Sequence, residues 1–134
     1  MEPHKKRAQK IIRGIVRHGD GRGKPLGFPT ANMRLHQPIP EGIYCAYATI
    51  DKRRYSAITF IGAAKTFHKT KRQAETYILD FDKNIYGKWL RVMLLKKLRG
   101  NKKFHSVQAL IRAMRLDEKQ ARIFFSQRHI THQK

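Results

Sequence analysis

The chain has few acidic residues, a single cysteine and no long apolar run, and each shortage excludes a class of protein. Because Cys45 is the only cysteine, an intramolecular disulfide is impossible and a zinc site built from several cysteines is excluded. No stretch approaches the roughly 18 apolar residues of a membrane-spanning helix. Residues 1–10 are charged and lack the apolar segment of a secretory signal. We therefore expect a cytoplasmic protein without a membrane partner.

The shortage of acidic residues leaves a large positive charge. Nine Asp and Glu stand against thirty Lys and Arg, a net charge of +21. Such a chain holds polyanions non-specifically at roughly 10⁻⁴ to 10⁻⁶ M. Basic clusters alternate with Tyr47, Tyr55 and Phe67, a pattern typical of RNA-binding barrels. Charge alone leaves two interpretations open, a nucleic acid as the main partner and a solvated cationic surface.

The length of 134 residues fits one compact domain, since domains usually have roughly 100 to 150 residues. The 40% of hydrophobic residues are enough to fill one core. We expect a basic extension over residues 1–10, a folded domain over 11–126, and a flexible tail over 127–134. The protein is expected to be a monomer.

Short segments with β-strand character follow one another closely, each bounded by turn residues; they are 11–16, 43–50, 55–61, 75–81 and 89–95. This spacing favours an antiparallel barrel over alternating β-α-β units. In the last of these segments, Leu90, Val92 and Leu94 share one face. The long segment 17–42 is too rich in Gly and Pro to be predicted as a strand or helix, and its length is typical of a functional loop.

Helical spacing appears only near the C-terminus. Ser106 is a plausible N-cap. A first apolar stripe follows it, at Val107, Leu110, Ile111 and Met114. A second helix is predicted to begin through Asp117 and to carry Ala121, Ile123 and Phe124. Both stripes are expected to pack in the core.

Three glycines alternate in the segment 18–24, which reads HGDGRGK. Without a Cβ, the backbone N–H groups at Gly19 and Gly21 can approach a phosphate closely, and Lys24 can neutralise it. The segment matches neither the Rossmann fingerprint nor the P-loop. A flexible hairpin is the alternative interpretation.

The next motif reads Pro29-Thr30-Ala31-Asn32 and presents a hydroxyl and a carboxamide two positions apart. Both are hard oxygen donors. Mg²⁺ takes oxygen ligands and usually keeps waters and substrate phosphates as the others, so Thr30 and Asn32 fit half of a magnesium site. An ordinary turn, with Asn32 bonded to the backbone, is the alternative.

Glu75 is a carboxylate in a strand-like segment, on the same face as Tyr77, Leu79 and Phe81. A carboxylate in that position either emerges at the mouth of the barrel or is partly buried and needs a partner. As a catalytic group, Glu75 would accept the proton of an attacking hydroxyl. As a structural group, it would simply be solvated at the strand end.

Taken in order, these segments resemble the riboflavin kinase family, whose members also occur as the C-terminal module of bifunctional bacterial FAD synthetases. The resemblance runs from about Gly14 to Phe125. It rests on Gly14-Ile15-Val16 leading into HGDGRGKPLGFPTAN, Pro40-Glu41-Gly42-Ile43-Tyr44, ETYILDF with Tyr86-Gly87, Leu98-Arg99, and Lys103-Phe104 before Ser106. Several spaced motifs in one order are more specific than a single glycine loop.

The resemblance implies a mainly β fold, a six-stranded antiparallel Greek-key barrel with a C-terminal helical segment. It implies Mg²⁺-dependent transfer of the γ-phosphoryl group of ATP to the ribityl 5′-hydroxyl of riboflavin, giving FMN and ADP. By motif, Glu75 would be the catalytic base, and Thr30 and Asn32 would hold Mg²⁺. The ATP-binding residues would be Gly19, Gly21, Lys24, Thr30, Ile78, Asp80 and Tyr86, and the flavin-binding residues would be Arg99, Lys102 and Phe104.

The chain departs from the family pattern at two positions. Lys65 stands where a proline usually precedes Thr-Phe, and Phe60 replaces a common asparagine. Too few residues precede Gly14 to encode an adenylyltransferase module, so FMN production without FAD production is expected. The alternative hypothesis, from another class of protein, is a basic β-barrel that binds nucleic acid without catalysis.

Overall fold

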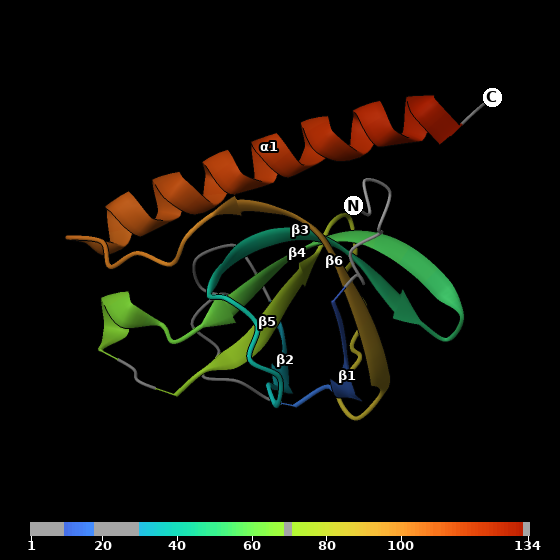
Figure 1. Cartoon of the computed structure of the whole chain (residues 1–134), viewed down its shortest axis with the longest axis horizontal. Coiled ribbons are helices and arrows are strands. Elements are labelled where there is room, and N and C mark those ends of the chain that lie inside the picture. Colours follow the sequence, from blue (N-terminus) through green and yellow to red (C-terminus); the bar gives the residue numbers. More distant parts are fainter. Residues whose placement is uncertain (1–9, 18–29, 69–70, 133–134) are drawn as a thin grey trace, which may run out of the picture.

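The computed structural model describes residues 10–17, 30–68 and 71–132 (Figure 1). Within these residues it contains six strands, a short 3₁₀ turn at Lys65–Phe67 and one long helix. The strands are β1 (Ile11–Ile15), β2 (Ala31–Arg34), β3 (Gly42–Ile50), β4 (Arg53–Gly62), β5 (Gln73–Ile78) and β6 (Trp89–Arg99), and the helix is α1 (Val107–His132).

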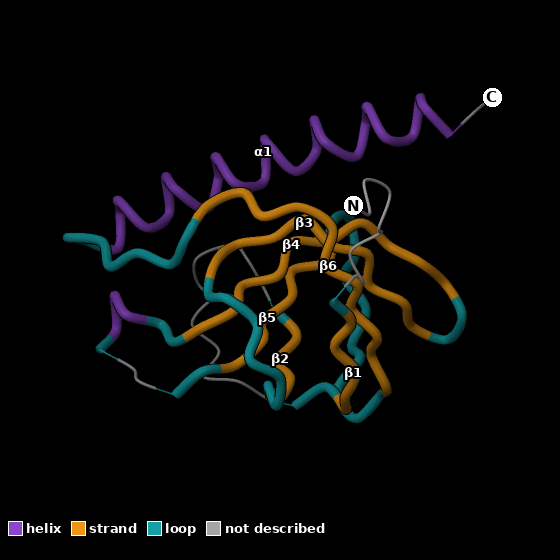
Figure 2. Tube along the Cα trace, viewed as in Figure 1, coloured by secondary structure: helices purple, strands orange, loops and turns teal. Residues whose placement is uncertain are grey.

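The strands form a nearly closed antiparallel barrel in the order β1-β6-β3-β4-β5-β2 (Figure 2). Just beyond the end of β1, Arg17 bridges to Asn32 of β2, with a 2.8 Å hydrogen bond from the Arg17 N–H to the Asn32 carbonyl. This bridge joins the two outer strands of the order. The predicted fold class, a six-stranded antiparallel barrel with a C-terminal helical segment, is confirmed.

The interior of the barrel is packed with side chains. Leu90, Val92 and Leu94 all point into it, as their alternation predicts, and each is at most 6% exposed. Alanines fill much of the remaining interior. Two buried hydroxyls, those of Thr59 and Thr76, satisfy each other at 2.9 Å. Because a small barrel with a filled interior leaves no room for a ligand, a substrate site must lie outside it.

Two strand predictions were wrong. The segment predicted as a loop without strands contains β2, a short strand with buried Ala31 and Met33. β5 ends at Ile78, and Phe81 does not share the face of Glu75, because Asp80 takes a left-handed conformation with φ 55° that turns the chain. Phe81 instead packs against the barrel core.

One continuous helix replaces the two that the sequence predicts. Ser106 caps it as expected, since its Oγ accepts a 3.1 Å hydrogen bond from the Ala109 N–H. The helix passes through Asp117 without a break and continues to His132, into the segment predicted as a flexible tail. The division of the chain into an extension, a domain and a tail stays a prediction.

Helix α1 lies across one side of the barrel (Figure 1). Ala121 and Phe125 are buried there, packed with Cys45 of β3 and Ile58 of β4. The prediction that both apolar stripes pack in the core was wrong at two positions, because Val107 is 38% exposed and Ile123 51% exposed. Among the described residues, no helix is both long and apolar enough to cross a bilayer.

Candidate active site

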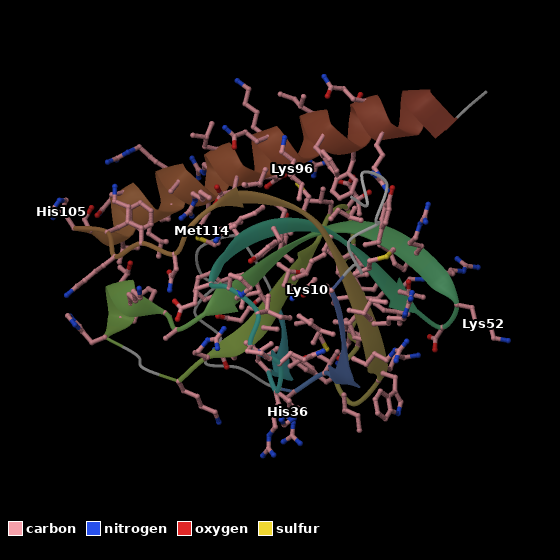
Figure 3. The ribbon with its side chains drawn as sticks, in the orientation of Figure 1. Lys10, His36, Lys52, Lys96, His105 and Met114 are labelled. Carbon is pink, nitrogen blue, oxygen red and sulfur yellow. The ribbon has the colours of Figure 1, made fainter. Side chains whose placement is uncertain are left out.

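A cavity of about 140 Å³ lies outside the barrel, between the outer faces of β4 and β5 and the first half of α1. Met114 lines it from the side of α1 that faces the strands (Figure 3). One part of the wall is apolar and aromatic, from Ile43, Ile58, Phe60, Tyr77, Phe104 and Leu110. Another part is polar, from Thr30, Glu75, Arg99, Asn101, Lys102 and Asp117. The wall therefore combines surface for a flat apolar ligand with charged groups at one rim.

Strand pairing brings Glu75 to the Thr30–Asn32 motif. β2 runs antiparallel to β5 with Asn32 directly opposite Glu75, so the two side chains lie on the same face of the sheet. Thr30 stands two positions before Asn32, and its Oγ1 donates a 3.4 Å hydrogen bond to Oε1 of Glu75. One hydroxyl, one carboxamide and one carboxylate thus meet beside the cavity.

Asn32 has the environment of a ligand-binding residue. The side chain is 6% exposed, and its Oδ1 has no hydrogen-bond partner among the described residues. A buried polar atom without a partner is costly and calls for an explanation. Thr30, Asn32 and Glu75 offer only hard oxygen donors, which suit Mg²⁺. The described residues contain no cluster of three or more His, Cys, Asp or Glu, so a metal site of that composition is not present in this part of the chain.

The three residues predicted to bind flavin come together at the cavity rim. Arg99 ends β6, and Lys102 and Phe104 follow it in the connection to α1. The Arg99 guanidinium lies 5.4 Å from the Phe104 ring centroid, and the Lys102 ammonium lies 5.5 Å from it. Both cations therefore lie within the range of a cation–π contact with this ring.

Asp117 is a site residue that sequence reasoning missed. It is 5% exposed, and its two oxygens accept hydrogen bonds of 2.8 Å from Nε and Nη2 of Arg99. A bidentate pair of this kind fixes both position and orientation. The sequence does show Asp117, next to Glu118, between two apolar helical stripes, but its partner on β6 could not be read from local spacing.

A second polar contact at the cavity involves Asn101, close to Arg99 in the sequence. Asn101 donates through Nδ2 to Oε1 of Glu41 at 2.8 Å and to the Ala63 carbonyl at 3.0 Å. Gly62 sits against this pair with φ +138°, and a Cβ there would lie 2.9 Å from the Glu41 oxygen. This backbone conformation favours glycine, and a side chain there would push the Glu41 and Asn101 side chains apart. Glu41 and Asn101 were not singled out from the sequence.

The two departures from the family pattern both lie at the cavity. Phe60 is part of its apolar wall, and Lys65 begins the 3₁₀ turn that forms one edge. Thr66 in the same turn accepts a 3.1 Å hydrogen bond from the Phe104 N–H, which connects this turn to the loop before α1. The substitutions therefore change the surface that a bound ligand meets.

Three residues predicted to bind ATP lie elsewhere. Ile78 is buried in the barrel core, Asp80 forms a two-point ion pair with Arg122 of α1, and Tyr86 is 47% exposed in the connection from β5 to β6. Hydrogen bonding to Arg122 lowers the pKa of Asp80. None of the three lines the cavity among the described residues. Gly19, Gly21 and Lys24 lie outside the described residues, so the nucleotide roles of all six stay predictions.

The lone cysteine has no part in this site. Burial raises the pKa of the Cys45 thiol to about 11, so the group stays neutral near pH 7. A thiolate is the reactive form of cysteine, which argues against a nucleophilic role. Burial also raises the pKa of Tyr77 on the cavity wall, which keeps that phenol protonated.

Comparisons with known proteins agree with this architecture. The family described as Flavokinase, riboflavin kinase, matches residues 7–125. The trifunctional protein RibF/MnmA of Mycoplasmoides gallisepticum is 39% identical over 117 residues, covering 85% of this chain and 18% of that protein. The bifunctional riboflavin kinase/FMN adenylyltransferase of Bacillus subtilis is 32% identical over 122 residues, covering 87% of this chain and 39% of that protein.

A solved structure shares the fold. The crystal structure of riboflavin kinase from Trypanosoma brucei superposes with a TM-score of 0.64 and 24% identity, covering 90% of this chain and 83% of that one. The chain belongs to the riboflavin kinase family, because the family match spans nearly all of it. It spans 18% and 39% of the length of the two curated relatives described above.

Proposed function

We propose that the chain is an ATP-dependent riboflavin kinase that forms FMN and ADP. The observation that carries the proposal is that Glu75 and Thr30 line a cavity with an aromatic wall, with Asn32 directly opposite Glu75. Membership of the riboflavin kinase family supports the choice of flavin as the acceptor. Phosphoryl transfer needs positioned groups and charge neutralisation more than covalent help, and this rim offers the required groups.

Glu75 is proposed as the general base. Its carboxylate lies at the cavity rim, where a ribityl hydroxyl would approach if the flavin ring lay along the apolar wall. The hydrogen bond from Thr30 orients the carboxylate, which is proposed to accept the proton of the attacking hydroxyl. The proton moves to Glu75 as the hydroxyl oxygen attacks the γ-phosphorus.

Thr30 and Asn32 are proposed to hold Mg²⁺ through Oγ1 and Oδ1. The unpartnered, buried Oδ1 of Asn32 supports this assignment. Mg²⁺ held there with the nucleotide phosphates would supply neutralisation of the charge on the transferred group. Gly19, Gly21, Lys24, Ile78, Asp80 and Tyr86 remain the proposed contacts to the rest of the nucleotide.

The flavin is proposed to lie between Phe104 and the wall formed by Phe60 and Tyr77. Arg99 is already held by Asp117, so it fixes the shape of this wall rather than serving as a mobile charge. Lys102, in contrast, is exposed and makes no ion pair within the described residues, so it is available to a bound flavin or phosphate.

The test is direct. Purified protein is incubated with riboflavin, ATP and Mg²⁺, the flavins are separated, and FMN is quantified against reactions that lack ATP or Mg²⁺. FMN formation that needs both would support the proposal. A folded protein that forms no FMN above a heat-killed control would contradict it. Gel filtration of the same sample checks the further proposal that the protein works as a monomer, and fractionation of producing cells checks that it is cytoplasmic.

A further inference from the structure

A row of arginines crosses the outer face of the barrel, beside the area that α1 covers. Arg13 of β1 is directly opposite Arg91 of β6, Arg91 is opposite Thr49 of β3, and Thr49 is opposite Arg54 of β4. Residues paired in this way point to the same face of a sheet. Because neighbouring strands are about 4.8 Å apart, the row of four positions spans roughly 14 Å.

This row of like charges is expected to lower the free energy of unfolding. Arg13 and Arg91 face each other directly, and like charges in that arrangement destabilise a sheet. Within the described residues, no ion pair involves Arg13, Arg54 or Arg91. The acid nearest to Arg54 in the sequence, Asp51, is itself bound to Lys88 at 2.6 Å. The described part of the chain thus supplies no counter-charge to these three arginines.

Aromatic side chains lie on both sides of the arginine row. On one side, Tyr47 has the Arg54 guanidinium 4.0 Å and the Arg128 guanidinium 5.5 Å from its ring centroid. Nε of Arg128 also donates to the Tyr47 hydroxyl at 3.1 Å. On the other side, Trp89 is 67% exposed and is paired with Ile15, which is 44% exposed. Two guanidiniums thus converge on one ring, and a second ring lies open to solvent.

Further cations border the same face. Lys52 projects into solvent from the turn between β3 and β4 (Figure 3). Lys96 of β6 lies 5.8 Å from the Phe124 ring centroid. The surface is therefore a cationic face with interleaved rings, without an acid at its centre among the described residues.

We propose that this arginine face, made of Arg13, Arg54, Arg91, Tyr47 and Trp89, binds a single-stranded nucleic acid. Guanidinium groups bind phosphates with two parallel hydrogen bonds, so three of them along one row suit the repeated charges of a nucleic-acid backbone. Exposed rings beside the row provide stacking surfaces for unpaired bases. A cationic row with a ring on each side favours a nucleic acid over an anionic membrane, which needs a larger continuous apolar surface.

The proposed binding surface is separate from the cavity. None of its five residues lines the cavity, and none has a role in the proposed phosphoryl transfer. Nucleic-acid binding at the arginine face therefore does not depend on the proposed kinase activity, and the two proposals can fail independently.

The test compares two triple variants of equal net charge in the full chain. The first replaces the row itself, Arg13→Gln, Arg54→Gln and Arg91→Gln. The control replaces three exposed cations on α1, Arg112→Gln, Arg115→Gln and Lys119→Gln. Labelled oligouridylate and oligothymidylate are titrated at several salt concentrations. Circular dichroism checks folding, and FMN formation is measured on all proteins, with no change expected in either variant.

The row variant is expected to lose about tenfold or more in affinity at physiological salt. Its salt slope should fall by about two, since each single-strand phosphate contact contributes roughly 0.7. The control should lose about threefold or less, because charges beyond a Debye length of about 8 Å are largely screened. Equal losses in both variants, or no loss in either, would overturn the proposal and leave only non-specific charge.

Trp89 is the only tryptophan, so its fluorescence reports on this face alone. Stacking of a base should quench it when oligonucleotide is added. Vesicles containing phosphatidylserine serve as the competing partner. A blue-shifted emission with vesicles, and no quenching with either oligonucleotide, would overturn the proposal in favour of a membrane. If the row variant does not fold, Thr49→Glu, which places a carboxylate within the row and keeps every arginine, should cause the same loss of binding.

Discussion

Cationic side chains beside the cavity and those on the arginine face differ in their ion pairs. Beside the cavity, Arg99 is held by Asp117 at 2.8 Å, and Lys65 lies 3.8 Å from a Glu41 oxygen. On the arginine face, the described residues contain no ion pair to Arg13, Arg54 or Arg91. Paired charges hold a geometry in place, whereas unpaired charges of one sign attract a counter-charge. The first side is suited to positioning a small substrate, and the second to binding a polyanion.

The largest effect is expected where the cavity side loses its base. Glu75→Gln keeps the size of the side chain and its hydrogen bond to Thr30 but removes the proton acceptor. Turnover of riboflavin should fall by about 10² to 10⁴, the usual contribution of a general base. Steady-state FMN formation measures the loss, and Glu118→Gln on α1 is the matched control. Turnover like that of the control would remove Glu75 from the mechanism.

A smaller effect is expected when an arginine on the cavity side loses its ion pair, so that it resembles the arginines of the arginine face. Asp117→Asn leaves Arg99 without its counter-charge in a partly buried position. The free energy of unfolding should fall by about 2 kcal/mol, the range for a lost hydrogen bond to a charged group. The KM for riboflavin should rise more than kcat falls, because the cavity wall is changed and the base is not. Urea unfolding and FMN kinetics check this.

Asp82→Asn, an exposed acid in the connection after β5, is the control for that measurement. It should change neither quantity. If Asp117→Asn behaves like this control, the pairing of Arg99 with Asp117 does not organise the cavity.

The smallest effect is expected from the opposite change on the arginine face. Thr49→Glu sets a carboxylate between Arg91 and Arg54. Cross-strand pairs of opposite charge stabilise a sheet by roughly 0.2 to 1 kcal/mol, so the free energy of unfolding should rise by about 0.5 kcal/mol. Urea unfolding at low salt measures the change, and Thr49→Gln controls for side-chain size. A destabilised Thr49→Glu protein would mean that these arginines already have partners.

Sequence alone predicted most of the barrel, because inward-facing apolar residues alternate with outward-facing residues along its strands. Leu90, Val92 and Leu94 mark the interior face of β6 without any knowledge of the fold. β2 was missed because only Ala31 and Met33 point inward and the neighbouring prolines suggest a loop. The inward position of Phe81 was missed because it depends on the left-handed conformation of Asp80, which residue spacing does not reveal.

The candidate site was predictable only in part. Glu75 could be singled out as a carboxylate on an otherwise apolar face, and Thr30 and Asn32 as oxygen donors two positions apart. Their proximity follows from the pairing of β2 with β5, which no local pattern shows. Asp117 and Asn101 act through partners distant in the sequence, at Arg99 and Glu41, so only the folded chain reveals them.

The most direct measurement of the proposed catalytic centre locates the metal. Mn²⁺, added with ADP to isotope-labelled protein, broadens the NMR signals of nearby amides. Broadening is predicted to be strongest at Thr30, Asn32 and Glu75, while the amides of Arg13 and Arg91 on the arginine face keep sharp signals. Broadening centred away from Asn32 and Glu75 would contradict the proposed position of phosphoryl transfer.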